Sequence, residues 1–127
     1  MKLTKKQKAI NKKQRYMQTK AYADKIAKKQ FKVDFINARS AMIVRDGGKC
    51  VFCKKVVGVH YQTCHIIPQE FKATHNEVDN LLLACFYHHK VGKYSMHNHP
   101  LWVSKWLQIN RPGQYAWVME RIDAEDY

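Results

Sequence analysis

Apolar residues recur at helical spacing in the segment that precedes the first pair of cysteines. Phe35, Ala38, Met42 and Val44 supply the apolar face of a predicted helix over residues 34–46. Two adjacent glycines follow this segment directly. Because glycine adopts the left-handed C-cap conformation at little cost, we expect the helix to end there.

Two further helices are predicted near the C-terminus. Pro100 is suited to the first helical turn, with Asn98 or His99 at the cap. The segment Arg111-Pro112-Gly113 separates this helix from the next. The apolar face of the first of these helices consists of Trp102, Trp106, Leu107 and Ile109. That of the second consists of Tyr115, Val118, Met119 and Ile122.

Strand-forming residues lie between these helices. Residues 56–67 are rich in Val, Tyr, Thr and Ile, contain Gly58 as a turn residue, and are followed by Pro68. A polar loop comes next. It is followed by a short apolar run at 81–84, which we interpret as a buried strand. We expect a short helix from His88 onward. The alternation of these elements predicts a small α+β domain.

Residues 1–33 differ from the rest and form a predicted basic arm, with a compact domain over 34–127. Residues 1–32 contain 12 of the 23 basic residues and a single acidic residue, and they lack Gly and Pro. We expect a long, exposed, partly helical arm that orders on a phosphate backbone; a solubilising tail is the alternative. The predicted phosphate contacts of the arm are Lys5, Lys6, Lys8, Lys12, Lys13, Arg15, Lys20, Lys28 and Lys29.

The formal net charge of +13 points to a polyanionic partner, and DNA is the first candidate. No apolar run approaches the ~20 residues needed to span a bilayer, and the N-terminus has no signal-peptide core. We therefore expect no membrane association and a cytoplasmic location, or a nuclear one in a eukaryote. In such a reducing compartment, paired cysteines indicate metal ligands rather than disulfides.

Three of the four cysteines, together with one histidine, occur in two pairs with metal-ligand spacing. Cys50 and Cys53 form the first pair, Cys85 and His88 form the second, and 31 residues separate the pairs. Three sulfurs and one imidazole suit a tetrahedral zinc ion. A structural zinc at this point would stabilise a domain whose core is small.

Three more motifs accompany these pairs in order. Cys64-His65-Ile66-Ile67-Pro68 lies between the pairs, Asn80 follows 15 residues after His65, and His89 comes nine residues later. In this order the chain resembles the HNH endonuclease superfamily over residues 39–122. Residues 85–122 are similar to phage-type HNH recombination nucleases of the NinG/Rap kind, through His-Asn-His-Pro-Leu-Trp at 97–102 and a Gly-x-Tyr start to the last helix.

The resemblance implies a ββα-metal fold and a metal-dependent DNA endonuclease. It implies that His65 is the general base, that His89 binds a catalytic Mg²⁺, Mn²⁺ or other divalent cation, and that Asn80 orients the loop of the base or binds the metal. The expected products carry 5′-phosphate and 3′-hydroxyl ends. The alternatives are a non-catalytic zinc module that binds nucleic acid and a homing-type nickase; the chain could act as a monomer or a homodimer.

One position departs from the pattern of the family, in which Asp or His often precedes the base. Cys64 stands there, and a thiolate suits zinc or another transition metal better than magnesium. Either Cys64 binds the catalytic ion or it faces away from the site.

Other roles also stay open at this point. Asn80 could be a plain turn residue, and His88 and His89 could exchange roles. His97 and His99 read as phosphate contacts or caps, with His97 as a possible helper of the catalytic metal, while His60 and His75 read as surface residues. Predicted phosphate contacts near the site are Lys54, Lys55, Lys72, Lys90, Lys93 and Arg111. Contacts of this kind predict weakly specific or structure-directed binding.

Overall fold

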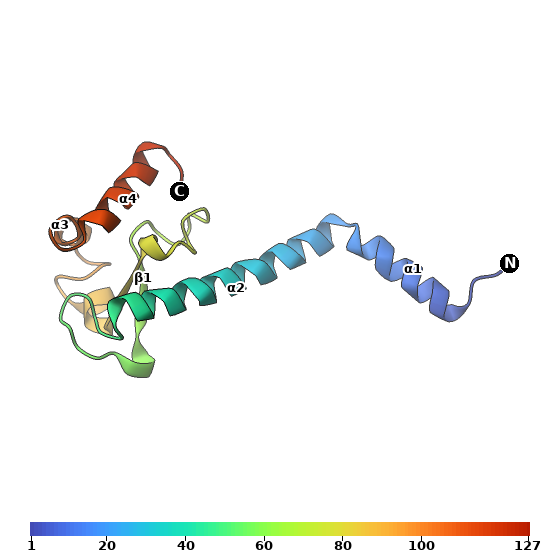
Figure 1. Cartoon of the computed structure of the whole chain (residues 1–127), viewed down its shortest axis with the longest axis horizontal. Coiled ribbons are helices and arrows are strands. Elements are labelled where there is room, and N and C mark those ends of the chain that lie inside the picture. Colours follow the sequence, from blue (N-terminus) through green and yellow to red (C-terminus); the bar gives the residue numbers. More distant parts are fainter. The chain divides into compact units, whose positions relative to one another are not determined.

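The computed structural model describes the backbone of residues 1–127 and every side chain except that of His60. These residues form helices and a two-stranded sheet, which confirms the α+β class at this coarse level (Figure 1). The chain divides into two compact units, Met1–Asp34 and Phe35–Tyr127. The elements are α1 (Lys5–Met17), α2 (Lys20–Asp46), η1 (Gly58–His60), β1 (Gln62–His65), η2 (Val78–Asn80), β2 (Leu81–Ala84), η3 (Tyr87–Val91), α3 (Pro100–Asn110) and α4 (Pro112–Asp123).

The first unit is helical and solvent-exposed, as predicted for the arm. Each residue of α1 is at least partly exposed to solvent. The Thr4 hydroxyl caps α1 by accepting a hydrogen bond from the Gln7 N–H at 3.1 Å. The Thr19 hydroxyl does the same for the Tyr22 N–H at 3.2 Å, where α2 begins.

The helix predicted over 34–46 is the C-terminal half of the much longer α2. The segment before it contains no Gly or Pro, so nothing in the backbone chemistry ends the helix earlier. Ala38 and Met42 are buried as predicted, whereas Val44 is 82% exposed and does not belong to the buried face. Gly48 has a φ of +69°, and its N–H donates to the Ile43 carbonyl at 3.1 Å, which ends α2 as expected.

The sheet is an antiparallel pair in which Gln62 lies opposite Ala84 and His65 lies opposite Leu81. The predicted strand over 56–67 is therefore too long: Gly58–His60 form a 3-10 turn, and the strand itself covers four residues. The prediction for 81–84 is confirmed, since all four residues of β2 are buried.

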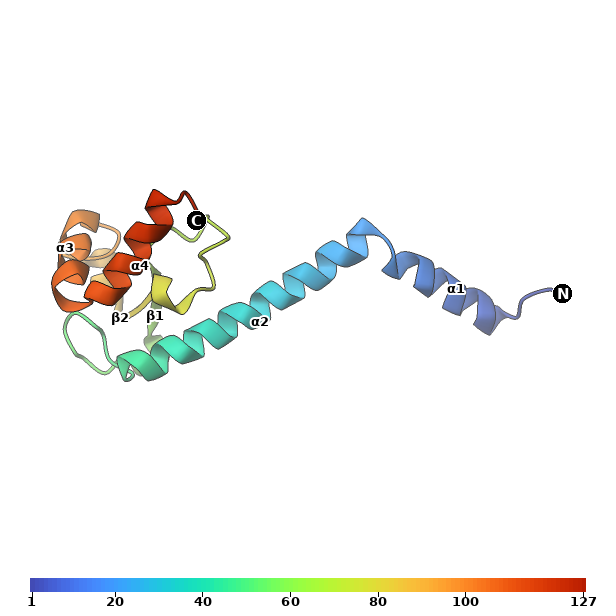
Figure 2. The ribbon, with the colours of Figure 1, turned by 45° about the horizontal axis from the view of Figure 1, so that its top comes forward.

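Each face of the sheet packs against a different part of the domain (Figure 2). Leu81 and Leu83 pack with Ala38 and Met42 of α2. On the other face, a core cluster joins the sheet to the first cysteine pair and to α3; its buried members are Cys50, Val51, Cys64, Leu82, Ala84, Val103 and Leu107. The segment around the two cysteine pairs is thus fixed to the sheet by apolar contacts.

Asp46 joins three elements through one buried carboxylate. It accepts a hydrogen bond from the Leu83 N–H at 2.9 Å and forms ion pairs with Arg45 at 2.8 Å and Arg111 at 3.0 Å. Burial raises the pKa of Asp46, but these hydrogen bonds and charges outweigh burial and hold it below its ordinary value. Arg111, predicted to contact phosphate, is therefore engaged in the fold.

The two C-terminal helices begin where the sequence indicates, but their apolar faces differ from the prediction. The His99 side chain caps α3 by accepting from the Trp102 N–H at 3.1 Å. Leu107 is buried, whereas Ile109 is 69% exposed, and Ile122 of α4 is 44% exposed. The predicted helix from His88 is only η3, a five-residue π-helical turn. None of the helices that the structure describes combines the length and apolar content needed to cross a membrane.

Candidate metal centre and histidine pocket

Four side chains from two turns converge on one point. The ligand atoms of Cys50, Cys53, Cys85 and His88 all lie within 4.8 Å of one another. His88 Nδ1 lies 3.3 Å from Cys85 Sγ and 3.8 Å from Cys50 Sγ, and the Sγ atoms of Cys53 and Cys85 are 3.9 Å apart. Ligands of a tetrahedral zinc ion, at bonds of about 2.0–2.3 Å, are about 3.3–3.8 Å from one another. The cluster therefore has the donor set and spacing to hold a metal such as zinc, and the exchanged assignment of His88 and His89 is not the one observed.

The backbone forms this site as a tight turn. The Cys50 N–H donates to the Lys55 carbonyl, and the Lys54 N–H donates to the Cys50 carbonyl, both at 2.9 Å. Lys54, directly after Cys53, has a φ of +62°, which lets the chain reverse as it leaves the first ligand pair. Burial alone would raise the pKa of the Cys53 thiol, but hydrogen bonds from the Lys55 backbone and from the Cys50 and Cys85 side chains together outweigh burial and lower that pKa. A more acidic thiol favours the thiolate form that binds metal.

His65 lies at the end of β1 with one ring nitrogen already engaged. Its Nε2 lies 3.1 Å from the His75 carbonyl oxygen, so Nε2–H donates and Nδ1 keeps its lone pair. The ring stacks on Phe35, with centroids 5.9 Å apart and planes 19° apart. Burial, together with the charges of His75 and Lys72, lowers the pKa of His65 to about 4. His65 is therefore a neutral imidazole at pH 7.

His75, predicted as a surface residue, is buried and belongs to the surroundings of His65. It is 8% exposed, and its ring centroid lies 4.5 Å from that of His65. The polar loop after Pro68 folds back on the sheet, which brings this ring against β1. The prediction for His60 falls on a side chain outside those that the structure describes.

His89 follows the metal cluster and forms a pair with His97. His89 Nδ1 lies 3.1 Å from Gln62 Oε1, so Nδ1–H donates to that oxygen and Nε2 presents its lone pair. The Nε2 atoms of His89 and His97 are 3.1 Å apart. Burial, followed by the charges of His97 and Lys90, lowers the pKa of His89 to about 4.

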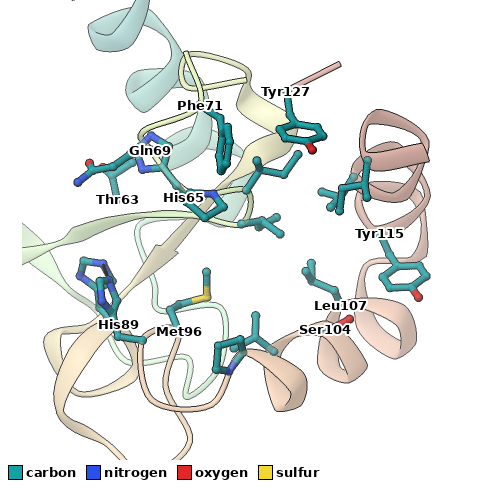
Figure 3. A pocket seen from close by; sticks show the side chains of 18 of the residues that line it. Thr63, His65, Gln69, Phe71, His89, Met96, Ser104, Leu107, Tyr115 and Tyr127 are labelled. Carbon is teal, nitrogen blue, oxygen red and sulfur yellow. Dashed lines mark hydrogen bonds between the residues drawn. The ribbon is translucent and has the colours of Figure 1, made fainter. Parts of the chain in front are cut away.

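These histidines share one cavity of about 800 Å³. His65, His89, His97 and Lys90 line it, and the rest of the lining comes mainly from the segment after β1 and from α3 and α4. Figure 3 shows His65 and Phe71 on one wall and Met96, Ser104 and Leu107 on the opposite wall. His65 and His89, the residues predicted as the base and the metal ligand, thus line the same pocket.

Asn80 holds the loop that follows β1 and lies away from solvent. Its Oδ1 accepts from the Ile67 N–H at 2.6 Å, and its Nδ2 donates to the carbonyls of Ile67 and Thr74, both at 3.1 Å. It is fully buried, and the backbone engages both of its amide hydrogens and one lone pair of Oδ1. Of the expected roles, this geometry matches loop positioning.

Cys64, weighed as a second ligand of the catalytic ion, lies instead in the hydrophobic core. It is fully buried in the cluster that contains Leu82 and Val103. Successive residues of a strand point to opposite faces, so Cys64 and His65 cannot face the same site. Burial raises the pKa of the Cys64 thiol, which keeps it protonated.

Comparisons with protein-family models, with curated proteins and with solved structures find no match for this chain. Function is therefore inferred from the metal cluster, the histidine pocket and the charge of the chain.

The basic residues predicted to contact phosphate are exposed, with the exception of Arg111. Lys90 is the member of this set that lines the cavity of the histidines. The Lys93 ammonium lies 5.4 Å from the centre of the Tyr94 ring. The other exposed members are Lys54, Lys55, Lys72 and the predicted arm residues. Their contact with DNA stays a prediction.

Two residues that orient the pocket histidines were not predicted from the sequence in these roles. The His75 carbonyl orients His65, and Gln62 orients His89. His97, for which the sequence indicated a possible role beside the catalytic metal, lies against His89. Nothing in the local sequence distinguishes Gln62 from an ordinary strand residue, because its role depends on which residue the η3 turn brings beside it.

Proposed function

We propose that this chain is a metal-dependent DNA endonuclease of the HNH type, stabilised by a structural zinc. The observation that supports this most strongly is that an oriented, neutral His65 shares a cavity with the His89–His97 pair. Phosphodiester hydrolysis needs a proton acceptor for water and a positive charge at the phosphate, and these two groups suit the two tasks.

His65 is the general base. Its Nε2–H is held by the His75 carbonyl, so Nδ1 is the atom that takes the proton of the attacking water. The stack with Phe35 fixes the plane of the ring. A base positioned in this way contributes roughly 10²–10⁴-fold to the rate of a hydrolysis.

His89 and His97 would hold the catalytic ion. Two nitrogen ligands at right angles about a cation, each at about 2.1 Å, are about 3.0 Å apart, and the observed separation of the two Nε2 atoms is 3.1 Å. A divalent cation there would stabilise the charge on the leaving oxygen of the phosphodiester. Two imidazoles favour manganese, nickel or zinc over magnesium, which prefers oxygen ligands. Gln62 serves as a positioning residue, because it fixes the tautomer of His89.

The polyanion would be held by charge rather than by base reading. The net charge is +13, and the basic residues of the arm are exposed along two helices. Contacts of this kind are largely independent of sequence. We propose a structure-directed or weakly specific nuclease, in keeping with the resemblance to phage-type recombination nucleases.

The test is cleavage of supercoiled plasmid with Mg²⁺, Mn²⁺ or Ni²⁺, with a chelator control. His65→Ala is expected to lower the rate by at least about 10²-fold. The matched control is His99→Asn, which replaces a histidine outside the cavity and retains a good helix cap. Both variants should keep the zinc content of the wild type. Cleavage by His65→Ala at the wild-type rate would refute the assignment of the base.

A second experiment addresses the ion. His97→Ala should raise the Mn²⁺ concentration needed for half-maximal cleavage at least tenfold, whereas His99→Asn should leave it unchanged. Equal metal requirements in the two variants would exclude His97 as a ligand. If wild-type protein binds DNA but cleaves none of the substrates with any of these ions, the chain is a zinc-stabilised binding module instead.

A further inference from the structure

The cavity beside the histidines is larger and more apolar than phosphate chemistry requires. His65, His89 and His97 are three of the twenty residues that line a space of about 800 Å³. Much of its lining is hydrocarbon. The aliphatic and thioether side chains with accessible surface are those of Ile66, Met96, Met119 and Ile122. Beneath them the cavity borders on the core residues Ile67, Val103, Leu107 and Val118, which are buried. A site that bound the backbone of a duplex alone would need none of these groups.

We propose that this cavity takes the base of an unpaired nucleotide adjoining the scissile phosphate. The inference rests on the proposed function and names the class of substrate: single-stranded, flapped or bulged DNA. A nucleotide has a phosphate at one end and a flat, largely apolar base at the other. The cavity matches this, because Figure 3 shows His65 and His89 toward one side of it and Leu107 and Tyr115 toward the other.

The volume and the aromatic lining also suit a base. Pockets for ligands of nucleotide size commonly measure about 300–1,000 Å³. Phe71 and Tyr127 both line the cavity, with ring centroids 4.9 Å apart in an edge-to-face pair. Tyr115 approaches from α4 on the other side (Figure 3). Stacking of one base on an aromatic side chain contributes about 1–3 kcal/mol and does not depend on which base is present.

The position of the cavity explains why the nucleotide must be unpaired. A base within a duplex is covered by its neighbours and cannot enter a pocket lined by protein on several sides. Extruding a base from a paired strand costs a few kcal/mol, and this cost is absent or small when the nucleotide is already single-stranded. The apolar pocket thus selects for DNA structure without reading the sequence.

Binding is tested without cleavage by NMR of the labelled methionine methyl groups, using deoxyadenosine 5′-monophosphate as the probe and no catalytic metal. The chain has five methionines, of which Met96 and Met119 line the cavity, Met42 is a buried residue of α2, and Met17 lies in α1. The Met96 and Met119 methyl signals should shift with saturation, and those of Met17 and Met42 should not. Deoxyribose 5-phosphate, which lacks the base, should bind at least tenfold more weakly.

Filling the cavity provides the matched variants. Ser104→Phe places a ring in the cavity and should weaken binding of the mononucleotide at least tenfold. Gln108→Phe adds the same ring at an exposed position of α3 outside the cavity and should leave binding unchanged. An unshifted Met42 signal reports that each variant is folded. Equal shifts with the two probes, no shift at either cavity methionine, or unaltered binding by Ser104→Phe would each overturn the inference.

A cleavage experiment links the pocket to the reaction. A flapped oligonucleotide should be cut at least tenfold faster than the same substrate with an abasic site beside the scissile phosphate, and Ser104→Phe should remove this difference. Equal rates with and without the base overturn the pocket while leaving the endonuclease intact. If no substrate is cut, the proposed hydrolysis fails, and the methyl shifts still decide whether the cavity binds a base.

Discussion

Replacing Asn80 with alanine tests whether this residue holds the loop around the base or serves the metal. In the folded protein, Asn80 satisfies three backbone groups at once: the Ile67 N–H at 2.6 Å and the carbonyls of Ile67 and Thr74 at 3.1 Å. The residue is fully buried, so water does not reach these groups unless the loop opens. The substitution therefore leaves the Ile67 N–H and the Ile67 carbonyl without these partners, whereas the Thr74 carbonyl still accepts from the Glu77 N–H at 3.2 Å.

The magnitude follows from the number of groups left unpaired. Each buried polar group without a partner costs about 1–3 kcal/mol, and the lower value is expected here because the segment after β1 is short of regular structure and can relax. The total is about 2 kcal/mol, or a loss of about 1.3–2 M in the urea midpoint at an m-value of about 1–1.5 kcal/mol/M. A domain with the usual 5–15 kcal/mol of stability would remain folded.

The assay is urea unfolding followed by tryptophan fluorescence, with Asn110→Ala as the control. Asn110 is exposed and makes one side-chain hydrogen bond, to the Trp106 carbonyl, so its loss should cost less than about 0.5 kcal/mol. Asn80→Asp keeps the acceptor for Ile67 but cannot donate to the two carbonyls, and it should be as unstable as Asn80→Ala. If Asn80→Ala unfolds within 1 kcal/mol of the wild type yet loses metal-dependent cleavage, Asn80 acts at the ion and the loop-positioning role is wrong.

Four other predictions follow from the same structure. The purified protein should contain about one zinc per chain by mass spectrometry of the metal, and Cys85→Ser should lose it and melt earlier; full zinc content in that variant would exclude the four-ligand site. Because burial lowers the pKa of His65 from 6.5 to about 4, the unfolded chain binds a proton that the folded chain does not in that range, so stability should fall as the pH falls from 6.5 toward 4. His65→Gln should reduce this loss of stability by about 1–2 kcal/mol, a value discounted for partial exposure. The free energy of unfolding is measured at pH 7 and 4.5, and an equal loss in the variant and the wild type would contradict the prediction. Asp46→Asn should cost about 2 kcal/mol, less than the ~3–5 kcal/mol for breaking a fully buried ion pair, because Arg45 and Arg111 are 27% and 26% exposed and can turn to solvent; thermal unfolding at the wild-type temperature would contradict it. Replacing the five lysines of α1 with glutamine should make the slope of log DNA affinity against log salt concentration shallower, by up to about 0.9 for each phosphate that the helix no longer neutralises. Fluorescence anisotropy across salt concentrations measures this slope, and an unchanged slope would exclude the helix from the interface.

The sequence was sufficient to predict features that depend only on residues close together along the chain. The two cysteine-containing pairs have ligand spacing, and the four side chains lie together as that spacing predicts. The run 81–84 is apolar throughout, and it is a buried strand. The glycines after Asp46 and the proline at 100 mark helix ends through backbone geometry alone, and the structure has helix ends at both. Each of these signals is complete within a few residues.

Features that depend on distant partners were decided only by the tertiary structure. Val44 and Ile109 have the right residue type for a core face but meet no packing partner, so both are exposed. His75 and Arg111 are polar and were assigned to the surface or to DNA, whereas the folded chain brings them against His65 and Asp46. The Nε2 atoms of His89 and His97 lie 3.1 Å apart, and both residues line one cavity with His65. These positions depend on how the segments after β2 fold against β1. The sequence by itself determined which residues can bind metal, cap helices or fill a core, because these are properties of residue type and spacing. Only the tertiary structure decided which of them meet, because burial and long-range contacts are properties of the whole packed domain.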